Sequence, residues 1–220
     1  MFLSKNVIRL DCSKGSFMYA VTEKDGVTLI DTSIPGRGKK IFSELAGHGI
    51  TPDRIKRILL THSDADHIGN LPFILKKTGA KAYISRDELP CLYLKNFPRK
   101  IKDIINIPFR LRVAKTVTEF NPGEIKTIKL IEMPGHTRGH AVYEFGDILF
   151  SGDMFRKMRY WHEKGPLLVT GDRKQALESL KKIDISKYGL VCPAHGLPED
   201  VTKHYDAFLK RLEKKVSKSS

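Results

Sequence analysis

Metal-binding side chains are concentrated in one short segment, Thr61-His62-Ser63-Asp64-Ala65-Asp66-His67. Side chains two positions apart in an extended loop point the same way, so His62 and Asp64 can face one point. Asp66 and His67 leave the loop where an apolar helical pattern begins, so they can face a second point. Imidazole and carboxylate groups are common ligands of catalytic metals, and the segment therefore predicts two adjacent metal positions.

Three further candidate ligands follow later in the chain, each beside glycine or proline residues that let the backbone turn tightly. They are the imidazole and carboxylate residues of Pro134-Gly135-His136, Ser151-Gly152-Asp153 and Pro193-Ala194-His195-Gly196. Each candidate lies just after a predicted strand. Ligands gathered at strand ends along one edge of a sheet are the usual geometry of a site in an α/β protein.

The elements that position these residues alternate between strands and helices. Strand patterns occupy residues 7–10, 17–21, 27–30, 57–60 and 81–84. The run 57–60 is short and wholly apolar after its first residue, as in a buried strand, and it ends at the metal-binding segment. Apolar spacing over 68–75 predicts a helix, which Gly79 would close.

The second half of the chain repeats this order. Strand patterns occupy residues 125–131, 141–145, 148–150 and 190–192. Asp172 and Gln175 form an Asp version of the capping box before one helix, and residues 201–212 predict a final amphipathic helix. Between the halves, residues 86–115 carry three prolines among basic and aromatic residues, which favours an irregular or helical insertion. This insertion is named here the basic cap.

The ordered motifs resemble those of the metallo-β-lactamase superfamily, in its glyoxalase II-like branch. That family carries H-x-H-x-D-H, then a lone histidine, an aspartate and a last histidine, usually within T-H-x-H-x-D-H-x-G, G-H-T-x-G-H, G-D and H-G. The matching segments here are Thr61 to Gly69, Gly135 to His140, Gly152-Asp153 and His195-Gly196. An unrelated chain would rarely contain all of them in this order, although each alone is common.

The resemblance implies a four-layer αββα sandwich of the α/β class, with residues 1–220 as one domain. It also implies two divalent metal ions, zinc by default. The implied ligands are His62, Asp64 and His136 for one ion, Asp66, His67 and His195 for the other, and Asp153 as the bridge. Asp31 resembles the family's acid that braces the ligand loop, and His140 is expected to orient its loop and not to bind metal.

Asp64 departs from the family pattern, which has a histidine at this position. With Asp64, Asp66 and Asp153 ionised, the site supplies one more negative charge than usual, so we expect a weaker pull on the proton of a bound water. More oxygen ligands also make iron or manganese credible beside zinc. The alternative for Asp64 and Asp66 is that either merely caps the helix that begins near His67.

The resemblance indicates a hydrolase in which a metal-bound hydroxide attacks the substrate and Asp66 accepts or passes on a proton. The favoured substrate is a small ester, thioester or lactone with an anionic portion. The candidate substrate residues, which could equally be a solvated rim, are Arg138, Arg156, Arg159 and Tyr160. A glyoxalase II is less expected, because the sequence shows no obvious room for the C-terminal helical domain of that branch. A homoserine lactone lactonase is also less expected, because Arg156 stands where those enzymes have tyrosine.

Composition leaves other classes open. A net charge of +14 and a pI of about 9.7 raise nucleic acid as a partner. A phosphodiesterase or nuclease is thus the alternative enzyme, with Tyr93, Phe97 and Phe109 able to stack bases, although a lysine-rich solvated surface is favoured. A di-iron redox protein is less favoured. No segment predicts a signal peptide or membrane span, which indicates a cytoplasmic protein, and the three cysteines are expected to be buried thiols.

Overall fold

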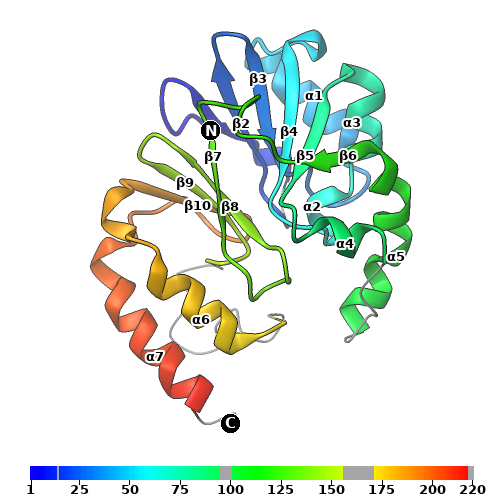
Figure 1. The fold of residues 1–220 in the computed structure, drawn as a ribbon. Helices are drawn as coiled ribbons and strands as arrows, with labels where there is room; N and C mark the ends of the chain where they lie inside the picture. The colour runs from blue at the N-terminus through cyan, green and yellow to red at the C-terminus, as the bar shows by residue number, and fades with distance from the viewer. Residues whose placement is uncertain (14, 95–100, 156–170, 218–220) are drawn as a thin grey trace. The chain divides into compact units, whose positions relative to one another are not determined.

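The computed structural model describes residues 1–220 except 14, 95–100, 156–170 and 218–220 (Figure 1). The chain divides into two compact units, Met1–Asn121 (unit 1) and Pro122–Ser220 (unit 2). Each unit has its own sheet and its own apolar core. Within the described ranges, no helix combines the length and apolar character that crossing a membrane requires. The single domain and the cytoplasmic location stay predictions.

Unit 1 contains a six-stranded mixed sheet with the strands in chain order. β1 to β3 form an antiparallel meander, and β3 to β6 run parallel to one another. The strands are β1 Val7–Arg9, β2 Tyr19–Glu23, β3 Gly26–Ile30, β4 Ile55–Leu60, β5 Lys81–Ile84 and β6 Val117–Glu119. Because the carboxyl ends of parallel strands meet at one edge of a sheet, the ends of β3 and β4 place Asp31 and Thr61 side by side.

The helices of unit 1 pack against its sheet and form one apolar core with it. They are α1 Gly38–Gly47, α2 Ala65–Ile68, α3 Leu71–Thr78, α4 Leu89–Leu92 and α5 Ile101–Val113. Ile41 of α1 and Leu71 of α3 pack with Ile58 of β4, and all three are fully buried. Gly79 ends α3 in the left-handed conformation at φ 66°, as its position after the helical pattern predicts.

The described part of residues 86–115 is helical, in α4, α5 and a 3-10 helix at Ala114–Thr116. Pro108 lies inside α5, where it removes one helical hydrogen bond. Phe109 is partly buried against the apolar core of unit 1, and base stacking by its ring stays a prediction. Tyr93 is 47% exposed, and Phe97 lies outside the described residues.

Unit 2 contains a four-stranded sheet in the order β10-β9-β8-β7. Its elements are β7 Lys129–Glu132, β8 Ala141–Phe145, β9 Ile148–Gly152, β10 Leu190–Pro193, α6 Arg173–Lys182 and α7 Tyr205–Ser217. β7 begins four residues after the predicted start at 125, because Ile125 and Ile128 are buried outside the ladder. The N-cap half of the predicted capping box is confirmed, since the Asp172 side chain accepts from the Gln175 amide at 2.9 Å, whereas the Asp172 amide donates to the carbonyl of Gly135.

The core of unit 2 lies between its helices and its sheet. Leu177 of α6 and Phe208 of α7 belong to one buried cluster with Leu149 of β9. Tyr205 of α7 donates its hydroxyl to the carbonyl of Leu180 in α6 at 2.6 Å, which holds the two helices side by side (Figure 1). β9 and β10 are parallel neighbours, so they deliver the residues after Gly152 and Pro193 to the same sheet edge.

The three cysteines differ in exposure. Cys192 in β10 is fully buried, as predicted, whereas Cys12 and Cys91 are only half-buried. Burial raises the pKa of Cys12 to about 12, and the neighbouring Glu44 carboxylate adds to the shift. The Cys12 thiol therefore stays protonated at neutral pH although it is partly exposed.

The loop that carries His136 is fixed to the start of α6. The amides of Gly171 and Asp172 donate to the carbonyls of His136 and Gly135 at 3.0 and 2.8 Å. Gly135 has φ +141°, and a Cβ added there would lie 2.4 Å from Cα of Ala176. Only glycine allows this close approach of two backbone segments.

We expect Gly135→Ala to lower the free energy of unfolding by about 3 kcal/mol, because the added Cβ must push α6 away and the backbone φ is strained. Gly146→Ala is the matched control in the same unit: Gly146 has φ +61° but no atom within 4 Å of an added Cβ, so about 1 kcal/mol is expected. Urea unfolding measures both. Equal losses would show that the contact with α6 carries no weight.

Candidate metal centre

His62 is the second residue after β4, and its ring nitrogen Nδ1 lies 3.0 Å from Oγ1 of Thr61. Oγ1 of Thr61 also lies 2.8 Å from Oδ2 of Asp31, and the Thr61 amide donates to Oδ1 of Asp31 at 2.8 Å. The carboxylate can only accept, so the Thr61 hydroxyl gives its proton to Asp31 and accepts one from Nδ1 of His62. This network assigns the unprotonated nitrogen of His62 to Nε2.

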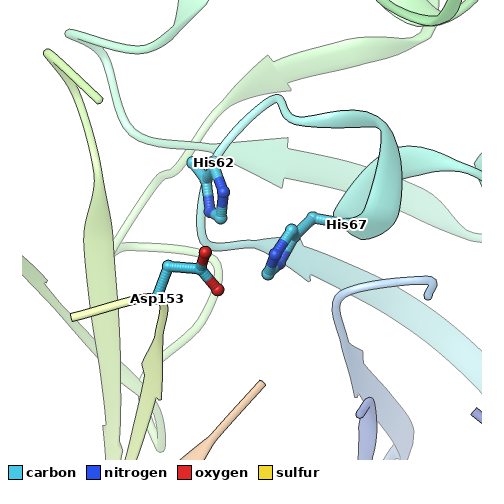
Figure 2. Close-up of side chains that lie close together, drawn as sticks. All are labelled: His62, His67 and Asp153. Carbon is cyan, nitrogen blue, oxygen red and sulfur yellow. The ribbon is translucent and has the colours of Figure 1, made fainter. Parts of the chain in front are cut away.

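His67 lies in α2 and is fixed by the same carboxylate. Its Nδ1 donates to Oδ2 of Asp31 at 2.8 Å, which again makes Nε2 the unprotonated nitrogen. Figure 2 shows the rings of His62 and His67, whose centroids lie 3.9 Å apart. The expected bracing role of Asp31 is confirmed: this residue is 2% exposed, has φ +59°, and holds the loop through three hydrogen bonds.

Each of these imidazoles faces a carboxylate of the same segment. Oδ2 of Asp64 lies 3.7 Å from Nε2 of His62, and Oδ2 of Asp66 lies 3.7 Å from Nε2 of His67. Both distances are too long for a hydrogen bond. They suit two ligands of one tetrahedral ion, whose donor atoms are about 3.4 Å apart when each lies about 2.1 Å from the metal. Unit 1 therefore offers two imidazole and carboxylate pairs.

The capping alternative fails for Asp64. The residue occupies the position before α2, but its side chain makes no capping hydrogen bond, and only its backbone carbonyl accepts from the His67 and Ile68 amides. Asp66 lies within the first turn of α2 and not before it, and its side chain is 34% exposed. Neither carboxylate is placed as a side-chain cap.

In unit 2, the carboxylate of Asp153 lies between two histidines. Oδ2 of Asp153 lies 3.3 Å from Nε2 of His136, and Oδ1 lies 3.1 Å from Nε2 of His195. Asp153, drawn in Figure 2, follows β9 and is 4% exposed. Its backbone amide donates to Nε2 of His140 at 3.1 Å, so His140 holds the backbone at Asp153.

The donor set of each unit fits a divalent cation such as Zn²⁺. Unit 1 presents two imidazole nitrogens assigned as unprotonated and two carboxylate oxygens, while unit 2 presents two imidazoles around a buried carboxylate. Nitrogen and oxygen donors of this kind are what zinc takes in catalytic sites. Cys192 is fully buried in β10 and packs in the core, as expected.

The sequence analysis did not identify several residues that contact residues 61–67, the ligand loop. Glu88, fully buried, accepts from the amide and the hydroxyl of Ser63 at 3.0 and 2.6 Å. Asn106 and Arg110 of α5 contact Asp64 at 2.8 and 3.1 Å. The spacing of four between Asn106 and Arg110 places them on one helix face, which is the one pattern that could have indicated them.

The candidate substrate residues stay predictions. Arg138 lies in the loop after His136 and is exposed. Arg156, Arg159 and Tyr160 lie outside the described residues.

The family model of the metallo-beta-lactamase superfamily matches residues 14–195. This is well over half of the chain, and the protein therefore belongs to this superfamily. The predicted family and the α/β fold class, with two sheets and their helices, are confirmed.

Relatives and solved structures agree with this assignment. The chain is 26% identical over 191 residues to a hydroxyacylglutathione hydrolase of Pectobacterium carotovorum subsp. carotovorum, covering 86% of this chain and 65% of that protein. A metallo-beta-lactamase family protein from Thermus thermophilus superimposes with a TM-score of 0.72 at 18% identity, covering 98% of this chain and 82% of that one. A dizinc quorum-quenching lactonase superimposes with a TM-score of 0.63 at 18% identity, covering 82% of this chain and 72% of that one. The chain spans 65% and 42% of the length of two such hydroxyacylglutathione hydrolases.

We expect Asp31→Asn to weaken zinc binding tenfold to a hundredfold, because one amide cannot accept from Thr61 and His67 as the carboxylate does. Asparagine tolerates the left-handed backbone at this position, so the fold should persist. Competition with a chromophoric chelator measures the affinity. Asp53→Asn, which removes the same charge at an exposed position, is the control. Equal affinity in both variants would refute the role of Asp31.

Proposed function

We propose that this chain is a metal-dependent hydrolase with a dinuclear centre, supported by its superfamily membership. The proposed metal ligands are His62, Asp64, Asp66 and His67 of unit 1 and His136, Asp153 and His195 of unit 2. The observation that carries the proposal is the set of imidazole and carboxylate pairs within each unit, 3.1 to 3.7 Å apart.

The pairs support one division of the ligands between two ions. His62 faces Asp64, and His67 faces Asp66, so each pair suits a separate ion. The two oxygens of Asp153 face different histidines, which would suit a carboxylate shared by two ions. By the family resemblance, His136 would join the first ion and His195 the second.

Bound divalent ions supply Lewis-acid chemistry, since they lower the pKa of water and stabilise negative charge that develops on a substrate oxygen. The chain's own residues position these ions and handle protons. Asp31 keeps His62 and His67 in the tautomer whose Nε2 is unprotonated. Asp66 has the most exposed carboxylate of the ligand loop, which suits it to receive a proton at Oδ2 or to pass one to a leaving group.

The proposed substrate is a small ester, thioester or lactone with an anionic portion. Support comes from the relatives named hydroxyacylglutathione hydrolase, which their name describes as acting on an acyl derivative of glutathione. The exposed Arg138, next but one to His136, is a candidate for binding the anionic portion, together with Arg156, Arg159 and Tyr160. Zinc is the proposed metal, with iron or manganese as alternatives.

Elemental analysis and a substrate panel test the proposal. We expect two metal ions per chain, and hydrolysis of a model thioester or lactone that stops on chelation and returns with Zn²⁺. Asp153→Asn should lower kcat/KM at least a hundredfold and reduce the metal content, because one oxygen of the bridge becomes an amide. Wild-type turnover and metal content in this variant would contradict the dinuclear assignment.

A nuclease or phosphodiesterase is the second candidate, and the charge of +14 is the observation in its favour. Two residues of the basic cap weaken it. Arg110 is 5% exposed and bonded to Asp64, so it is not presented to a nucleic acid, and Phe109 is partly buried against the core of unit 1. Hydrolysis of a phosphodiester in the panel, with RNA binding that falls steeply with salt, would favour this candidate over the ester hydrolase. Iron that consumes oxygen would instead indicate a redox protein.

A further inference from the structure

The carboxylate of Asp64 lies against two hydrogen-bond donors from α5. Its Oδ1 accepts from Nδ2 of Asn106 at 2.8 Å and from Nη2 of Arg110 at 3.1 Å. All three residues are buried, with exposed fractions of 5 to 6%. Burial of this kind strengthens hydrogen bonds to charged groups and makes an unmatched charge costly.

The amide of Asn106 has a fixed orientation. Its Oδ1 accepts from the backbone amide of Ala65 at 2.7 Å, so Nδ2 must point to Asp64. A flipped amide would lose the bond to Ala65 and would turn its oxygen toward the carboxylate. Asn106 is therefore a donor to position 64 and cannot readily become an acceptor.

Arg110 is fixed as well. Its Nε donates to the carbonyl of Ser63 at 3.2 Å, while its Nη2 donates to Asp64. Guanidinium has donors only and stays charged, so this side chain also demands an acceptor at position 64. An imidazole that bound metal through one nitrogen would carry a proton on the other and could not satisfy these two donors.

The two donors also select which oxygen of Asp64 is available to a metal. Oδ1 is engaged by Asn106 and Arg110, and Oδ2 is the atom that lies 3.7 Å from Nε2 of His62. The carboxylate therefore presents a single oxygen toward the partner imidazole.

The charge of Asp64 is balanced locally. The expectation from the sequence was that this extra carboxylate makes the site one unit less positive, with a weaker pull on the proton of a water. A buried guanidinium at 3.1 Å supplies an opposite charge that the expectation did not include. The pair of Asp64 and Arg110 is formally neutral, as one neutral histidine would be.

We propose that Asn106 and Arg110 are positioning residues of the metal site, and that with Asp64 they replace, as one set, the histidine of the family pattern. The inference rests on the proposed function, because it takes Asp64 as a metal ligand. In this proposal, α5 fixes Asp64 so that one of its oxygens is directed toward a metal, while Arg110 balances the charge of the carboxylate. Position 64 then accepts a histidine only if Arg110 is changed with it.

The alternative is that Arg110 merely straps α5 to the ligand loop. A strap predicts that loss of Arg110 harms the site whatever residue stands at position 64. The positioning role predicts that loss of Arg110 strengthens zinc binding in the Asp64→His background, because Arg110 is unfavourable beside an imidazole. The sign of this effect separates the two explanations.

Zinc affinity, measured by chelator competition, decides between them in four proteins: the parent chain, Asp64→His, Arg110→Met and the double variant. We expect Asp64→His alone to weaken zinc binding at least tenfold, since it leaves a buried guanidinium beside an imidazole and a cation. Adding Arg110→Met should recover at least tenfold of this loss. No recovery, or a further loss, would overturn the proposal.

Arg112→Met is the matched control in the Asp64→His background. Arg112 lies two residues beyond Arg110 and is exposed, so its removal changes the net charge equally while solvent and salt screen its effect on the site. We expect it to recover less than twofold of the zinc affinity. Recovery equal to that from Arg110→Met would show a general charge effect and would overturn the specific role of Arg110.

Urea unfolding of the metal-free proteins gives a readout that is independent of zinc. The double variant should be more stable than Asp64→His alone, because it no longer buries a guanidinium without its carboxylate. A double variant that is less stable than Asp64→His alone would contradict the proposed pairing of Asp64 with Arg110. If the parent chain binds none of zinc, iron and manganese, the proposed function fails and this inference with it. If the parent binds two ions and Arg110→Met recovers nothing in the Asp64→His background, only this inference fails.

Discussion

A single buried carboxylate, that of Asp31, determines how the ligand loop presents its histidines. It accepts from Thr61 twice and from His67 once, and through the Thr61 hydroxyl it also sets the tautomer of His62. Parallel pairing of β3 with β4 places Asp31 beside Thr61, so the arrangement follows from the sheet itself. The backbone strain at φ +59° is the cost of turning Asp31 into the loop, and its three hydrogen bonds offset that cost.

The loop is also held from the side of the helices. Glu88 accepts twice from Ser63, and α5 adds bonds to Ser63, Asp64 and Ala65. These contacts satisfy backbone and side-chain groups that burial would otherwise leave costly. In unit 2 the corresponding support comes from the two residues before α6, since the amides of Gly171 and Asp172 donate to the carbonyls of His136 and Gly135. Ligands that must converge on small cations need such rigid supports.

The sequence predicted the candidate ligands, most of the strands and Asp31, because their evidence is local: a ligand motif, an apolar run, or a polar residue at a strand end. It did not predict the contacts of Asn106 and Arg110, which lie 42 and 46 residues from Asp64 along the chain. Arg110 looked like one more surface cation of a basic segment. Only the packing of α5, which no local pattern encodes, shows that it is buried.

Asp64 illustrates what a departure from a family pattern means physically. Considered alone, an acid in place of a histidine changes the charge and the metal preference of a site. With its partners included, it is half of a neutral pair whose amide and guanidinium donors require an acceptor. The identity of a candidate ligand is therefore constrained by the hydrogen-bonding groups behind it, in addition to any metal that it would bind. In this chain those groups come from α5, so the sequence of that helix and the motif at the end of β4 constrain each other.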